Sequence, residues 1–220
     1  MIRPFATISL AALSLALATE ARAQTQPDDF DDIVVTAQRE NATQIVNGGS
    51  AGVLGDKPAE DLPFAIRSYD ETLILNQQPQ TLGDVLENDP TIRLSYGFGN
   101  AAELFVIRGF ALFGDDIGLN GLYGVTPRQL VAPELLGSVQ VLNGASAFLN
   151  GAAPGGSGLG GNVNLILKRA EASDVTRATA SYEQKSRFGG SVDVSRRFGA
   201  NGEWGVRLNA AYRDGETAVD

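Results

Sequence analysis

The stretch formed by residues 138–169 constrains the fold of this chain most strongly. Apolar and polar residues alternate at both of its ends, in residues 138–142 and 162–167, and such alternation is typical of half-buried β-strands. Glycine accepts left-handed backbone angles and lets another segment approach closely. We therefore expect two strands joined by a tightly packed, glycine-rich connection. Its glycines are Gly151, Gly155, Gly156, Gly158, Gly160 and Gly161.

The same glycines also satisfy the G-x-G-x-x-G pattern of dinucleotide-binding sites, at Gly156, Gly158 and Gly161. That pattern requires a helix that begins at the glycines, because the N-terminus of this helix holds the pyrophosphate. Here a strand pattern follows instead, and no acidic residue lies at the distance expected for ribose binding. The dinucleotide interpretation is therefore the weaker one.

Several motifs in and before this stretch resemble the plug domain of TonB-dependent outer-membrane receptors, with the siderophore receptors as the most similar branch. Within the stretch they are FLNG at 148–151, APGGS at 153–157 and GNVNLILKR at 161–169. Earlier in the chain, IRGF at 107–110 is similar to a signature of the family, and LNGL at 119–122 to its following turn. The resemblance implies that residues 61–169 form an α+β plug domain.

Composition excludes some classes of function. The chain has 220 residues and a net charge of −9, which argues against nucleic acid as a partner, since phosphate binding requires a basic face. It contains no histidine, the commonest metal ligand and general base. It contains no cysteine either, so no disulfide holds it together.

The N-terminus has the pattern of an export signal. Arg3 supplies a positive charge, residues 5–18 are apolar, and Ala21-Arg22-Ala23 is a small-x-small cleavage site. The apolar run of about 14 residues is shorter than the roughly 20 that a bilayer-spanning helix needs. Residues 1–23 are therefore predicted to be a signal peptide, and the mature chain to begin at Gln24.

Residues 24–60 are predicted to form a flexible tail, with NGGS at 47–50 separating it from the folded part. The tail contains a β-branched run that could add a strand to the edge of a partner's sheet; an ordinary edge strand is the alternative. Under the resemblance this run, at 31–37, is a TonB box that binds TonB with its inner-membrane energising complex. The residues assigned to this contact are Asp32, Ile33, Val34, Val35, Thr36 and Ala37.

Within the plug, the local patterns predict short strands, helices and long loops. Strands are expected at 62–66, 92–94 and 104–107, and helices at 80–88 and 132–136. The loops carry the candidate binding residues, because loops on a rigid scaffold commonly do. In the family, plug loops help to bind the ferric chelate. By position this implies Tyr96, Phe98, Asn100, Phe113 and Tyr123, although the aromatic residues could equally be packing residues.

Two further observations concern charge in the plug. Many plugs have a charged segment where residues 136–145 are neutral here, so Arg108 is the remaining candidate for a plug–barrel contact. We therefore expect packing and hydrogen bonds to hold this plug in place. Asp115 and Asp116 are adjacent carboxylates without a spaced ligand set, so we expect them to be solvated and predict no metal site.

After residue 169 the pattern changes to three antiparallel strands, at 177–187, 191–198 and 203–213, with turns at 188–190 and 199–202. The third strand has apolar residues on one face, polar ones on the other and an aromatic residue near each end, which is typical of a transmembrane β-barrel. A soluble sandwich shares only the alternation. Residues 170–220 are predicted to start a barrel of about 22 strands, of which this chain would be a fragment.

Together with the resemblance, these patterns predict a receptor in the outer membrane of a Gram-negative bacterium that imports a ferric siderophore. The siderophore is the transported ligand, and no cofactor is expected. Serines occur without histidine and no paired carboxylates have a mechanistic setting, so no enzymatic activity is predicted. Three alternatives stay open: uptake of haem, cobalamin or a saccharide; a passive porin or adhesin; and a soluble periplasmic binding module.

Overall fold

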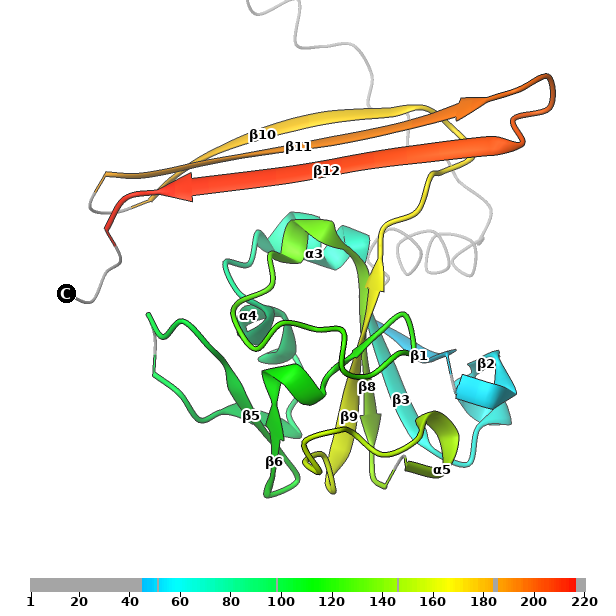
Figure 1. Cartoon of the computed structure of the whole chain (residues 1–220), viewed down its shortest axis with the longest axis vertical. Coiled ribbons are helices and arrows are strands. Elements are labelled where there is room, and N and C mark those ends of the chain that lie inside the picture. Colours follow the sequence, from blue (N-terminus) through cyan, green and yellow to red (C-terminus); the bar gives the residue numbers. More distant parts are fainter. Residues whose placement is uncertain (1–44, 51, 98, 146, 184–185, 217–220) are drawn as a thin grey trace, which may run out of the picture. The chain divides into compact units, whose positions relative to one another are not determined.

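The structure, a computed structural model, describes residues 45–50, 52–97, 99–145, 147–183 and 186–216 (Figure 1). These residues belong to one compact unit. The predicted signal peptide and the predicted TonB box, Asp32 to Ala37, lie outside the described residues, so both stay predictions.

A mixed six-stranded sheet forms the centre of the plug, in the order β2-β1-β3-β8-β9-β7 (Figure 1). The two strands predicted at the ends of the glycine-rich stretch are confirmed as β8 (Leu136–Asn143) and β9 (Gly161–Leu167), which pair antiparallel. The connection between them packs tightly, as expected. A Cβ on Gly160 would overlap the carbonyl oxygen of Ile107, so only glycine fits there.

The first strand of the sheet corrects the predicted domain boundary. Residues expected in the flexible tail form β1 (Ile45–Ser50), which pairs with β2 (Asp56–Pro58) and with β3 (Ala65–Asp70). The folded domain therefore begins by residue 45 and not at 61. Gly48 and Gly49, which suggested a linker, belong to this strand. A Cβ on Gly49 would overlap the side chains of Ser68 and Gln140, so glycine is required at that position.

Two helices cover the sheet, and one of them was missed. The predicted helix at 80–88 is present as the shorter α4 (Leu82–Leu86), which begins with a reciprocal capping box between Thr81 and Asp84. The helix α3 (Glu71–Gln77) lies just before it, with the Asp70 carboxylate accepting a hydrogen bond from the N–H of Leu73. A further helical turn, α5 (Ala147–Asn150), lies within the glycine-rich stretch.

The predicted strands at 92–94 and 104–107 are confirmed as β4 (Ile92–Leu94) and β5 (Leu104–Ile107). A strand that was not predicted, β6 (Phe110–Phe113), pairs with β5. A short strand, β7 (Gly118–Leu119), runs parallel to β9, and the helix expected at 132–136 is a 3-10 turn, η4 (Pro133–Leu135). Other 3-10 turns are η1 (Gly52–Leu54), η2 (Ala59–Asp61) and η3 (Gly114–Asp116).

The main hydrophobic core lies where the sheet, the two helices and the β4–β6 sheet meet. It is built from the alternate residues of the strands and the inward face of each helix. Its members are Tyr69, Ile74, Leu82, Val85, Leu86, Ile92, Phe105, Ile107, Leu112, Ile117, Leu136, Val139, Val141, Val163 and Leu165.

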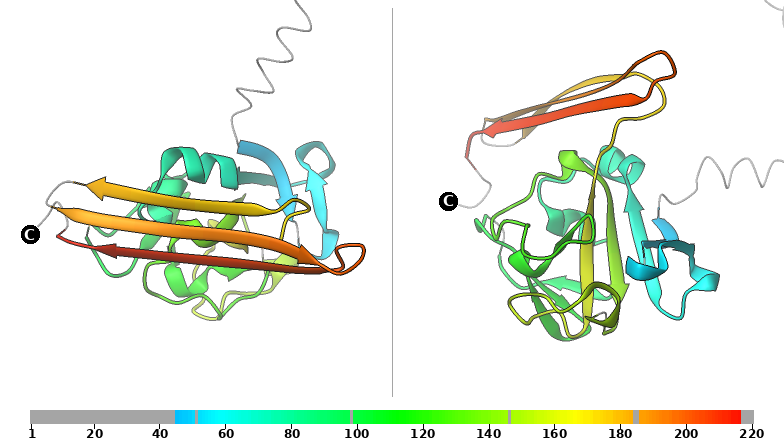
Figure 2. Two further views of the ribbon diagram at one scale, coloured as in Figure 1. Left: turned by 90° about the horizontal axis from the view of Figure 1, so that it is seen from above. Right: turned by 45° about the vertical axis from the view of Figure 1, so that its right-hand side comes forward.

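Three long antiparallel strands follow the plug: β10 (Val175–Glu183), β11 (Arg187–Phe198) and β12 (Trp204–Asp214) (Figure 2). The turn expected at 188–190 is wrong, because these residues lie in β11 and pair with residues of β10. The expected alternation of β12 is confirmed. Its apolar residues are exposed, with Trp204 at 75% and Leu208 at 62%, whereas the Arg207 side chain on the other face is 4% exposed.

Aromatic residues face each other across these strands at both ends. Tyr182 lies opposite Phe188 with ring centroids 5.0 Å apart, and Phe198 lies opposite Trp204. Among the described residues, no helix is both long enough and apolar enough to span a membrane.

Candidate functional site

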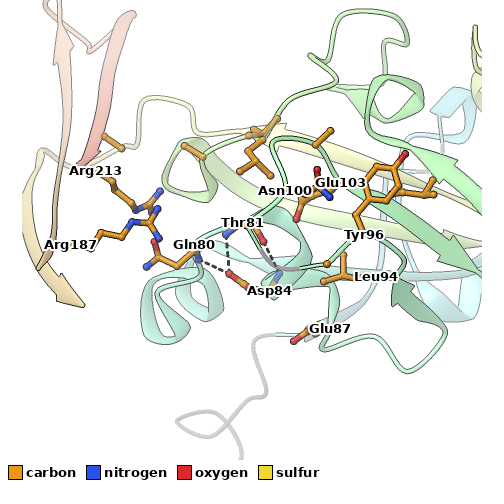
Figure 3. Close-up of a pocket in the computed structure, with 18 residues that line it drawn as sticks. Gln80, Thr81, Asp84, Glu87, Leu94, Tyr96, Asn100, Glu103, Arg187 and Arg213 are labelled. Carbon is orange, nitrogen blue, oxygen red and sulfur yellow. Dashed lines mark hydrogen bonds between the residues drawn. The ribbon is translucent and has the colours of Figure 1, made fainter. Parts of the chain in front are cut away.

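A cavity of about 490 Å³ lies between the plug loop at 95–103, the beginning of α4, and the ends of β11 and β12 (Figure 3). Its volume falls within the range of roughly 300–1,000 Å³ that is usual for small-molecule sites. The cavity is therefore the candidate ligand-binding site in the described part of the chain.

The loop at 95–103 forms one wall, and the strands at its base hold it. The N–H of Ser95 donates a hydrogen bond to the Leu104 carbonyl, 2.8 Å away, and Ala102 pairs with Gln129 in an isolated bridge. Gly99 has a φ of +83°, which lets the chain turn at the tip. The ends of the loop are thus fixed, while its centre carries exposed side chains.

The structure brings together only part of the predicted binding set. Tyr96 and Asn100 line the cavity, and Phe98 lies outside the described residues. Phe113 lies on β6 with the Arg128 guanidinium 5.7 Å from its ring centroid, and Tyr123 lines a separate cavity of about 120 Å³ beside the glycine-rich stretch. Phe113 and Tyr123 therefore do not share a site with Tyr96.

Carboxylates that the sequence analysis missed form the floor of the cavity. Asp84 accepts hydrogen bonds from the backbone N–H groups of Gln80 and Thr81, at 2.7 and 2.9 Å. Glu103 accepts one from the N–H of Gly83, at 2.8 Å. Burial raises the pKa of the Glu103 carboxyl, although the hydrogen bond from Gly83 opposes the shift. Capping residues and a loop glutamate thus give this floor an acidic character.

Two arginines from the strands complete the lining. Arg187 comes from the start of β11 and Arg213 from the end of β12, and Figure 3 shows their guanidinium groups close together beside Gln80. Arg213 is ion-paired with Glu134, and Arg187 lies 3.5 Å from Glu183. Because the strands face the plug with polar residues, both arginines reach the cavity.

A partly buried cluster of charges joins the plug to the three strands, with Lys168, Arg207 and Asp193 as its buried members. Glu71, at the start of α3, contacts Lys168, Arg177 and Arg207 at 2.9 to 3.2 Å. Asp193 on β11 contacts the same three cations at 2.7 to 3.8 Å. Glu171 pairs with Arg207 as well. We call these six residues the charged junction; three carboxylates balance three cations there.

The plug was expected to be held mostly by packing and hydrogen bonds, but toward β10–β12 the charged junction adds ion pairs. The charges come from α3 and from the strands, not from residues 136–145. Arg108 has a φ of +53°, is exposed and takes part in none of the ion pairs between described residues. Its predicted plug–barrel contact therefore stays a prediction.

Of the two adjacent carboxylates of η3, Asp115 is exposed as expected, whereas Asp116 is not. Asp116 is buried, and it accepts hydrogen bonds from the N–H groups of Gly155 and Ser157 and from the Ser157 hydroxyl. Burial acts to raise the pKa of Asp116, but these hydrogen bonds outweigh it and hold the pKa below its usual value. Asp116 thus fixes the glycine-rich stretch to η3. No group of three acidic residues suited to a metal ion occurs within the described ranges.

Comparisons with known proteins agree with this architecture. Residues 58–157 match the family described as TonB-dependent Receptor Plug Domain. The ferrichrome receptor FcuA of Yersinia enterocolitica is 43% identical over 176 residues, which cover 80% of this chain and 23% of that protein.

Solved structures agree as well. The ferric preacinetobactin receptor BauA of Acinetobacter baumannii is 43% identical, with a TM-score of 0.77 over 80% of this chain and 26% of BauA. The pyoverdine receptor FpvA of Pseudomonas aeruginosa shares the fold at 20% identity, with a TM-score of 0.70 over 82% of this chain and 26% of FpvA. The chain spans about a quarter of the length of these relatives. With its plug domain followed by antiparallel strands, the chain belongs to the TonB-dependent receptors and is similar to the siderophore receptors among them.

Proposed function

We propose that this chain forms part of an outer-membrane transporter of a Gram-negative bacterium that binds a ferric siderophore and imports it with energy from TonB. The observation that carries the proposal is the cavity between plug and strands. Its wall holds Tyr96 and Asn100 from the plug together with Arg187 and Arg213 from the strands. A ligand in this cavity would contact both parts of the molecule, so a change in the plug would alter its binding.

The outer face of the strands supports residence in a membrane. Trp204 and Tyr212 are exposed near the two ends of β12, and Leu208 lies between them. At roughly 3.4 Å per residue the two aromatic residues are about 27 Å apart along the strand. This length suits the apolar band of about 25 Å that outer-membrane strands present to lipid.

The position of the predicted TonB box supports coupling to TonB. Residues 31–37 precede β1, which lies next to β3 in the central sheet. β1 forms hydrogen bonds with β2 and β3, and the Ser68 hydroxyl donates a hydrogen bond to the Gly48 carbonyl at 2.7 Å. A partner that pulls on the preceding segment would therefore act directly on the plug sheet.

Uptake by cells that produce the full-length receptor tests the proposal. Labelled ferric siderophores would be supplied with and without a proton-motive force, to the native receptor and to Ile33→Pro. Proline cannot donate a strand hydrogen bond, so we expect surface binding to persist and uptake to be lost. Thr25→Pro, which lies in the polar segment before the predicted box, is the matched control and should import normally.

The outcomes separate the alternatives. Uptake of haem, cobalamin or a saccharide without any ferric chelate would keep the transporter and change its substrate. Uptake that is unaffected by Ile33→Pro would contradict TonB coupling and favour a passive barrel. Ligand binding by the isolated chain without a membrane would favour a periplasmic binding module.

A further inference from the structure

Acidic groups outnumber basic ones in the lining of the cavity between plug and strands. Its lining has three carboxylates, from Asp84, Glu87 and Glu103, and two guanidiniums, from Arg187 and Arg213. Hydrogen bonds to backbone N–H groups fix two of the carboxylates in place. Glu87 is exposed and takes part in none of the ion pairs between described residues.

Carboxylate partners already engage both guanidiniums. Arg213 pairs with Glu134, and the Nη1 atom of Arg187 lies 3.5 Å from Oε2 of Glu183. The second oxygen of Glu134 is buried and accepts no hydrogen bond within the described part of the chain. Neither arginine is therefore left as a free cation for an anionic ligand. The three acidic residues of the lining are therefore additional to the carboxylates that pair with these arginines.

We propose that this cavity selects ferric chelates by charge, so that it accepts an uncharged or cationic chelate such as a ferric tris-hydroxamate and disfavours a ferric tris-catecholate. The inference rests on the proposed function. Three singly charged hydroxamates neutralise Fe³⁺, whereas three doubly charged catecholates leave a trianion. In a partly desolvated cavity, repulsion between this trianion and the carboxylates is stronger than in bulk water.

The aromatic residue of the wall does not distinguish the two kinds of chelate. Tyr96 is 38% exposed and offers a broad apolar surface, which can pack against a catecholate ring or against the methylene chains of a hydroxamate. The charge of the wall therefore decides the preference. Glu87 is the residue to substitute, because it is an accessible carboxylate of the lining that no ion pair between described residues engages.

Binding to the purified full-length receptor tests the inference, with a ferric tris-hydroxamate of zero charge and a trianionic ferric tris-catecholate of similar size as probes. We expect the native receptor to bind the uncharged chelate at least about tenfold more tightly. Glu87→Gln should narrow this ratio about threefold and Glu87→Lys about tenfold, and added salt should weaken both effects. Glu60→Lys is the matched control, because Glu60 is exposed on η2 and does not line the cavity.

Three results would overturn the inference in different ways. Equal or tighter binding of the tris-catecholate would refute the charge preference and leave the proposed transport function intact. A ratio that changes equally in Glu87→Lys and Glu60→Lys would show that net charge, not the cavity wall, sets the preference. A receptor that neither binds nor imports any ferric chelate would refute the proposed function and the inference together.

Discussion

The plug buries its apolar residues, whereas the three strands that follow it expose theirs. In the plug, Phe105 and Leu112 are at most 1% exposed. In β12, Leu208 is 62% exposed, while the neighbouring Arg207 side chain is 4% exposed and lies in the charged junction. The plug therefore gains stability by removing its own apolar surface from water, whereas the strands meet the plug through charges and leave their apolar face for other surroundings.

The largest expected effect on stability comes from a change in the charged junction. Arg207→Met removes a buried cation and leaves two cations for the three carboxylates of the charged junction. We expect the free energy of unfolding of the full-length receptor in detergent to fall by about 3–5 kcal/mol. Urea titration followed by tryptophan fluorescence would measure it. Arg93 is an exposed residue of β4, so Arg93→Met is the control. An equal loss of unfolding free energy in both variants would show that the charged junction contributes little to stability.

Matched leucines in the two regions test the packing side of the comparison. Leu112→Ala leaves a cavity in the plug core, and we expect it to cost about 2–5 kcal/mol of unfolding free energy. Leu208→Ala removes the same atoms from an exposed position, so its cost in detergent should stay within about 0.5 kcal/mol. A large effect of Leu208→Ala in the same urea titration would mean that the outer face of β12 packs against protein.

A charged substitution distinguishes lipid from water on that outer face. Leu208 lies near the middle of β12, so in the proposed outer-membrane position an arginine there would lie near the centre of the bilayer. We expect Leu208→Arg to destabilise the receptor in phospholipid vesicles by about 2–4 kcal/mol. The same variant in detergent is the control, since detergent reorganises more easily around a charge. A cost near zero in vesicles would place this face in water.

Local patterns predicted the elements whose signals are local. The alternation of β8, β9 and β12 lies within each strand, and Pro79 and Pro90 bracket α4 in the sequence. The errors have non-local causes. β1 contains two glycines and is a strand because β2 and β3 lie on either side of it. α3 is the exception, because the Asp70 cap at its start is a local signal that the prediction overlooked.

The candidate site was only partly predictable for the same reason. Tyr96 and Asn100 line the cavity; their glycine-rich loop is a local signal, and the resemblance implied their role by position. Glu71 and Arg207 are 136 residues apart, and no local pattern pairs them. Arg213 could be assigned to the polar face of its strand, but its contact with Glu134 depends on how the strand meets η4.

Asp116 provides the smallest expected effect, and this effect depends on pH. Its pKa is lowered in the folded plug, so the carboxylate stabilises the fold above the unfolded pKa of roughly 3.9. This stabilisation is lost as the pH falls through the lower folded pKa. At neutral pH, Asp116→Asn should cost about 1.5–3 kcal/mol, because it weakens the charge-assisted hydrogen bonds to Gly155 and Ser157. Asp115→Asn, on the exposed neighbour, is the control. The difference between the two variants in urea titrations should shrink from pH 7 toward pH 3, and a difference that grows would contradict a lowered pKa.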